Sequence, residues 1–150
     1  MKVVDVKVDA RKKELLITAG RSTFRYPFAF VSGGDAVVAA KSDPELGSEA
    51  ISCFLASGET RTIHLDDIRA QLGDADYLRE QMLYDMTLQA LRIVRKKRVA
   101  KRALCRMLQT SPAQVYRLLD QTCYSKTVDQ MLRLLQVLGC TVKLDISHAA

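Results

Sequence analysis

The sequence predicts an α+β fold, in which a small antiparallel β domain at residues 1–75 precedes an all-α domain at residues 76–150 that ends in a short strand. Apolar residues alternate with polar ones through most of the first half, as they do in half-buried strands. They recur at helical spacing from residue 66 onward. The apolar fraction of 48% is sufficient for a buried core in a chain of 150 residues.

Hairpins are predicted in the first half. The stretch "VVDVKVD" alternates and places Val4, Val6 and Val8 on one face. "ELLITA" and "STFRYPFAFV" follow it and are joined by a short turn at Gly20, and "ISCFLAS" is expected to pair with "TRTIHL". Residues 32–50 are predicted to form a loop, with room for one short helix.

The third strand carries an aromatic pattern. Its aromatic residues fall at every second position, so we expect them to point to the core face of a sheet: Phe24, Tyr26, Phe28 and Phe30. A platform on which nucleic-acid bases stack is the alternative for such a row. Pro27 lies off that face and indicates an edge strand or a bulge.

Helices are predicted from residue 66 onward. "DDIRAQL" predicts a short helix that ends at Gly73. "DADYLREQMLYDMTLQALRIVRKKR" predicts one long helix, or two helices with a break near Asp85. "TVDQMLRLLQVLG" predicts the last helix, and "CTVKLDI" alternates as a final strand. Between them, "VAKRALCRML" predicts a helix whose inward residues are Ala103, Leu104, Met107 and Leu108.

The stretch "LQTSPAQVYRLLD" predicts the start of a further helix. Ser111 is a good N-cap, Pro112 suits the first helical position, and Gln114 completes a capping box. Only Gln109 and Thr110 separate this helix from the preceding one, which indicates a helix-turn-helix motif. Its buried side is formed by Val115, Leu118 and Leu119, and its outer side by Ala113, Gln114, Tyr116 and Arg117.

The positive charge of the chain is concentrated beside this motif. Residues 1–75 hold 10 Lys/Arg and 11 Asp/Glu, whereas residues 76–150 hold 13 Lys/Arg and 6 Asp/Glu. Such a run on its own is often only a solvated face. Because this one leads directly into the capped helix, we expect an anionic partner. The run contains no acid and comprises Arg92, Arg95, Lys96, Lys97, Arg98, Lys101, Arg102 and Arg106.

Residues 88–146 resemble the helix-turn-helix module of the phage-repressor (Cro/C1, XRE) superfamily, and its antitoxin-like branch most of all. The resemblance lies in "RALCRMLQTSPAQVYRLLD" and "TVDQMLRLLQVLGCTVKLDI", which cover about the last 60 residues. It implies a DNA-binding fold of five or nearly five helices that is usually dimeric. The N-terminal half is not securely recognised as a member of any family.

The resemblance also implies roles for individual residues. Pro112 lies at one of the positions where the family reads base edges, but it has no side-chain hydrogen bond to offer. Gln109 stands at the turn position that is commonly glycine, so we expect a left-handed conformation there. The base-reading candidates are Ala113, Gln114, Tyr116 and Arg117. The candidates for phosphate contacts are Lys96, Lys97, Arg98, Lys101, Arg102, Ser111 and Lys126.

The function expected from these features is that of a sequence-specific transcriptional regulator. Its partners would be double-stranded DNA and a second copy of the chain, with half-sites about one DNA turn apart. The alternative is an antitoxin-like protein-interaction module, which binds a partner protein such as a toxin through the β domain and regulates its own promoter. The β domain at residues 1–75 would serve dimerisation, effector binding or partner binding.

Enzymatic and membrane functions are not expected. The four cysteines are scattered without a C-x-x-C pair, and the two histidines, His64 and His148, are isolated. We therefore expect no catalytic residues, metal or cofactor. No stretch reaches the roughly 18 uncharged apolar residues of a membrane helix. The opening "MKVVDVKVDARKK" lacks the apolar core of a signal peptide, so a cytoplasmic location is expected.

Overall fold

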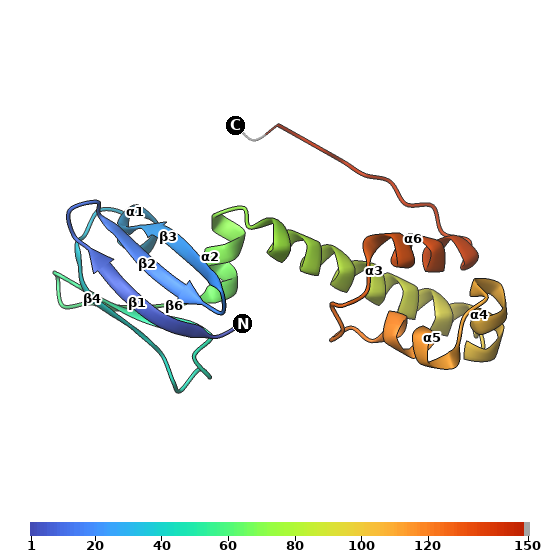
Figure 1. Cartoon of the computed structure of the whole chain (residues 1–150). Coiled ribbons are helices and arrows are strands. Elements are labelled where there is room, and N and C mark those ends of the chain that lie inside the picture. The colour runs from blue at the N-terminus through green and yellow to red at the C-terminus, as the bar shows by residue number, and fades with distance from the viewer. Residues whose placement is uncertain (149–150) are drawn as a thin grey trace. The chain divides into compact units, whose positions relative to one another are not determined.

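The computed structural model describes residues 1–148 and shows a mixed α+β chain (Figure 1). Those residues form two three-stranded antiparallel sheets and six helices, which confirms the predicted fold class. The chain divides into two compact units. The β unit comprises Met1–Tyr77, and the helical unit begins at Leu78.

The first sheet of the β unit has the order β1-β2-β3. Its strands are β1 (Val3–Asp9), β2 (Glu14–Ala19) and β3 (Ser22–Pro27), and the predicted hairpin turn at Gly20 is confirmed. Alternation along β2 buries Leu15 and Ile17 completely. This sheet therefore contributes one face to the core.

A β-bulge changes the predicted alternation of β1. The pairing register with β2 shifts between Val3 and Asp5. Because a bulge inserts one residue, Val3 turns inward while Val4 points to solvent with 70% of its surface exposed. The prediction that Val4 shares the inner face of Val6 is therefore wrong.

The aromatic row also ends earlier than predicted. Strand β3 stops at Pro27, and the short helix α1 (Phe28–Ser32) follows. Tyr26 and Phe28 are buried, but the helical turn leaves Phe30 46% exposed. The change from a two-residue to a helical period explains why Phe30 does not join the core face.

The second sheet has the order β4-β5-β6. Its strands are β4 (Val37–Ser42), β5 (Ala50–Leu55) and β6 (Thr60–His64), so the predicted second hairpin is confirmed. Strand β4 lies within the segment predicted to be a loop. The pattern there is weak because the register shifts between Val37 and Ala39 and interrupts the alternation.

Both sheets share one hydrophobic core. Helix α2 (Leu65–Gln71) closes it with the buried residues Leu65 and Ile68, and it ends before Gly73, which has a left-handed φ of +67° as expected for a C-cap. The Tyr26 hydroxyl donates a hydrogen bond to Gln71 on this helix. These contacts join the aromatic strand to the last element of the β unit.

The helical unit is built around one long helix. Helix α3 (Ala75–Lys97) continues through Asp85, so the alternative of two helices is wrong. Figure 1 shows the three shorter helices gathered along its second half: α4 (Lys101–Leu108), α5 (Pro112–Leu119) and α6 (Val128–Val137). Met107, predicted to face inward, is 47% exposed. The core of the unit includes Leu83, Ala90, Leu104, Val115, Leu118, Met131 and Leu134.

The predicted C-terminal strand does not form within the chain. Residues 141–148 follow α6 without helical or strand structure, and Figure 1 shows them as an extended segment. A strand needs a neighbour for its backbone hydrogen bonds, and the described part of the helical unit contains no other strand. The alternating pattern is present, but a strand to pair with is missing.

The bulge in β1 predicts a large loss of stability for one of two adjacent valines and almost none for the other. Val3→Ala is expected to lower the free energy of unfolding of the β unit by about 1–3 kcal/mol, because it removes buried methyl groups. Val4→Ala should change it by less than about 0.5 kcal/mol, because that side chain is exposed. Urea unfolding of both variants measures the difference, and equal losses would contradict the bulge.

Candidate nucleic-acid interface

A tight turn joins α4 to α5. Gln109 has φ 53° and ψ 48°, so the expected left-handed conformation at this residue is confirmed. The N–H of Thr110 donates to the carbonyl of Cys105 at 3.0 Å, which satisfies a carbonyl at the end of α4. The turn therefore ends α4 sharply and starts α5 within three residues.

The N-terminus of α5 is capped, but by half of the predicted capping box. Ser111 Oγ accepts a hydrogen bond from the backbone N–H of Gln114 at 3.2 Å, and Pro112 occupies the first turn. The side chain of Gln114 does not return to Ser111. Its Oε1 accepts a hydrogen bond from Arg117 Nε at 3.1 Å instead. The complete capping box lies at α6, between Thr127 and Gln130.

Arg117 links α5 to the start of α6. Besides the bond to Gln114, its Nη1 donates to Ser125 Oγ at 3.5 Å and its Nη2 donates to Gln130 Oε1 at 3.3 Å. The half-buried side chain is therefore held by acceptors on both sides. These bonds fix the plane of the guanidinium and use one N–H of each of its nitrogens, while each Nη has a second N–H.

The outward face of α5 is formed by Ala113 and Tyr116. Both side chains are exposed, and Tyr116 is 56% exposed. Lys101 at the start of α4 holds its Nζ 4.2 Å from the centroid of the Tyr116 ring, a cation–π contact. Of the base-reading candidates, these two residues face solvent, while Gln114 and Arg117 are partly buried and hydrogen-bonded to each other.

The basic run forms an exposed surface on the end of α3 and on α4. Every basic residue from Arg92 to Arg106 is exposed, and none of the ion pairs within residues 1–148 involves one of them. Lys97 differs from the others because its Nζ donates to the carbonyl of Leu138 at 2.8 Å, at the end of α6. The phosphate candidates with exposed side chains and no such bond are Lys96, Arg98, Lys101 and Arg102.

The structure contradicts a phosphate contact for Lys126. This side chain is only 1% exposed. Its Nζ donates to Thr87 Oγ1 at 2.7 Å, to the carbonyl of Leu118 at 2.9 Å and to the carbonyl of Asp120 at 2.7 Å. An ammonium has three N–H donors, so every one of them is bound inside the protein.

Lys126 instead stabilises the C-terminus of α5. The carbonyls of Leu118 and Asp120 lie at that end, where carbonyls lack partners within the helix and where the helix dipole favours a cation. Thr87 belongs to α3 and passes the chain of hydrogen bonds on to the carbonyl of Leu83 at 2.6 Å. Burial lowers the pKa of Lys126, and the nearby Cys123 and Asp120 act in the opposite direction.

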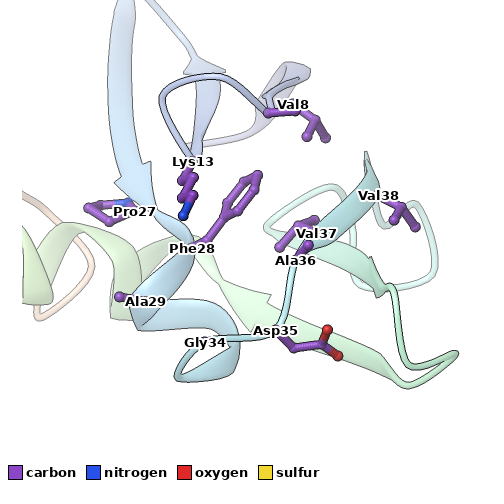
Figure 2. A pocket seen from close by; sticks show the side chains of 11 residues that line it. Val8, Lys13, Pro27, Phe28, Ala29, Gly34, Asp35, Ala36, Val37 and Val38 are labelled. Carbon is purple, nitrogen blue, oxygen red and sulfur yellow. The ribbon is translucent and has the colours of Figure 1, made fainter.

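The β unit contains a hollow of about 820 Å³. Figure 2 shows the ring of Phe28 directed into this space, between Val8 on β1 and Val37 on β4. The charged residues in its lining are Lys13 and Asp35. Because most of the lining is apolar, the hollow suits an apolar ligand or side chain better than an ionic one.

Two further findings concern metal sites and membrane-spanning helices. Within residues 1–148, no three His, Cys, Asp or Glu side chains lie together as a metal site requires. None of the helices in that range combines the length and hydropathy needed to cross a bilayer.

Comparison with known proteins identifies no relative. The chain matches no protein-family model, no curated protein and no solved structure. The resemblance to the phage-repressor superfamily therefore remains a prediction from the residues quoted above.

The buried ammonium of Lys126 predicts a large effect on stability. Lys126→Met keeps most of the side-chain volume but leaves Thr87, Leu118 and Asp120 without a donor, so we expect a loss of about 2–4 kcal/mol in the free energy of unfolding of the helical unit. Lys96→Met, at an exposed lysine of α3, is the matched control and should cost less than about 0.5 kcal/mol. Chemical unfolding followed by circular dichroism measures both, and equal losses would contradict this role.

Proposed function

We propose that this protein is a sequence-specific DNA-binding transcriptional regulator in which α5 enters the major groove. The observation that carries the proposal is the combination at α5 of fixed ends and a free face. Ser111 caps its start, Lys126 holds its end, and Ala113 and Tyr116 face solvent beside Lys101. A helix held in this way can be presented to a groove without losing much conformational entropy.

Base contacts would come from different chemistries along the helix. Ala113 offers a methyl group, which suits the C5-methyl of thymine. Each Nη of Arg117 has a second N–H that is not used in the bonds to Ser125 and Gln130. These two N–H groups can donate to guanine O6 and N7. Gln114 is the weakest base-reading candidate, because its side-chain oxygen already accepts from Arg117.

Phosphate contacts would come from the exposed basic surface next to α5. Lys96, Arg98 and Arg102 flank the junction of α3 and α4 and have no acidic partner among the described ion pairs. Basic side chains of this kind neutralise phosphates without reading sequence. They would therefore set affinity and orientation, while α5 would set specificity.

Partner-protein binding through the β unit is the second candidate function, as in the antitoxin-like alternative. The hollow beside Phe28 and Val37 favours it, because an apolar side chain of a partner would fill that space. In this version the protein would still regulate its own promoter through α5. The two candidates therefore differ in the role of the β unit.

The proposal is tested with two labelled duplexes of equal length: the DNA upstream of this protein's own coding region and a scrambled copy. At physiological salt, we expect the upstream duplex to bind more tightly by roughly a thousandfold or more. Equal binding that collapses as salt rises would leave only a non-specific basic surface. Binding to neither duplex would reject DNA binding and favour the partner protein.

The salt dependence of binding tests the basic surface. Replacing Lys96 and Arg102 with alanine should weaken binding to both duplexes and reduce the slope of log K against log salt by up to about two units, because fewer counterions are released. The matched control replaces Lys12 and Arg21, which are exposed basic residues of the β unit. If the control lowers the slope equally, the effect is one of net charge and not of phosphate contacts.

Arg117→Lys separates base reading from charge. Lysine keeps the charge but loses the planar fork, so binding to the upstream duplex should weaken by about 1–3 kcal/mol while binding to the scrambled duplex is unchanged. Arg133→Lys is the control, because Arg133 is an exposed arginine of α6 that pairs with Asp129. Equal losses on both duplexes would show that Arg117 reads no base.

A further inference from the structure

The segment that follows α6 has two different faces. An extended backbone places Val142, Leu144 and Ile146 on one side and Lys143 and Asp145 on the other. The three apolar side chains are 51%, 75% and 81% exposed in that order. A row of exposed apolar side chains on an unpaired extended segment is a template for pairing with another strand.

We propose that two copies of this protein dimerise by pairing residues 141–147 as antiparallel strands about a two-fold axis at Leu144. The segment is complementary to itself in this register. Lys143 of each copy lies opposite Asp145 of the other, and Val142 lies opposite Ile146. Leu144 of one copy lies opposite Leu144 of the other at the centre. One face of the two-stranded ribbon is therefore apolar throughout.

Other registers of the same segment lack this complementarity. A shift by one residue places Leu144 opposite a charged residue and mixes the two faces. A shift by two residues places Lys143 opposite Lys143 in one direction, or Asp145 opposite Asp145 in the other. Parallel pairing in register also brings like charges together, which destabilises a sheet. Charge and apolar pattern therefore select the same arrangement.

The helical unit offers a surface on which such a ribbon can rest. A hollow of about 360 Å³ lies beside the start of the segment, and its lining includes Met86 and Ile93 of α3, Leu135 of α6 and Val142 itself. A two-stranded ribbon alone is marginally stable in water and needs a hydrophobic face to pack against. The side chains of this hollow supply that face next to the first apolar residue of the segment.

Dimerisation through this segment does not depend on the proposed function, because it is measured without DNA. Analytical ultracentrifugation of the full chain across a concentration series should show a monomer–dimer equilibrium. Leu144→Lys should shift it toward monomer by about tenfold or more in Kd, since it places two ammonium groups face to face. Leu78→Lys, at a 61% exposed leucine of α3, is the matched control and should leave the equilibrium unchanged.

A charge exchange tests the register. Lys143→Asp and Asp145→Lys should each weaken the homodimer, because each places like charges opposite one another twice. The double variant should restore it, and a mixture of the two single variants should form the heterodimer in preference to either homodimer. A monomeric wild-type protein, or a Leu144→Lys variant that dimerises as tightly as wild type, would overturn the proposal. Failure of the charge exchange to restore pairing would overturn the register.

Discussion

The buried ammonium of Lys126 is the interaction on which the arrangement of the helical unit depends. It binds the last carbonyls of α5 and the hydroxyl of Thr87 on α3, so it joins the candidate recognition helix to the longest helix of the chain. Removing a charge from water is costly, and that cost is offset only because all of its donors are bound. The geometry of this site is therefore strict, and α5 has one position relative to α3.

Arg117 and Ser111 complete the restraints on α5. The hydrogen bonds of Arg117 to Ser125 and Gln130 hold the outer side of α5 to the start of α6, while Ser111 caps its N-terminus. The groups that position the helix are thus Arg117, the cap at Ser111 and the Lys126 ammonium at its C-terminal end. Ala113 and Tyr116 remain on the free side, next to the basic surface. Dimerisation through residues 141–147 would bring two such faces into one particle, as a two-fold symmetric DNA site requires.

Features that depend on neighbouring residues could be predicted from the sequence. Features that depend on contacts between distant residues, or on shifts of strand register, could not. The cap at Ser111, the left-handed turn at Gln109 and the hairpins depend on neighbouring residues, so the sequence was sufficient for them. The burial of Lys126 depends on Thr87, which lies 39 positions away in the chain, and a lysine in a polar loop carries no local sign of it. Strand β4 and the position of Val4 were missed because register shifts interrupt the alternation.

In the proposed function, the outward face of α5 is the surface that contacts DNA. Amide chemical-shift mapping of the full-length chain, titrated with the upstream duplex at physiological salt, tests it most directly. We expect the shifts to concentrate at Ala113, Tyr116 and Arg117 and in the basic segment around Lys101, with the β unit unchanged. Shifts confined to the β unit, or spread evenly over the exposed lysines and arginines of the whole chain, would contradict the claim.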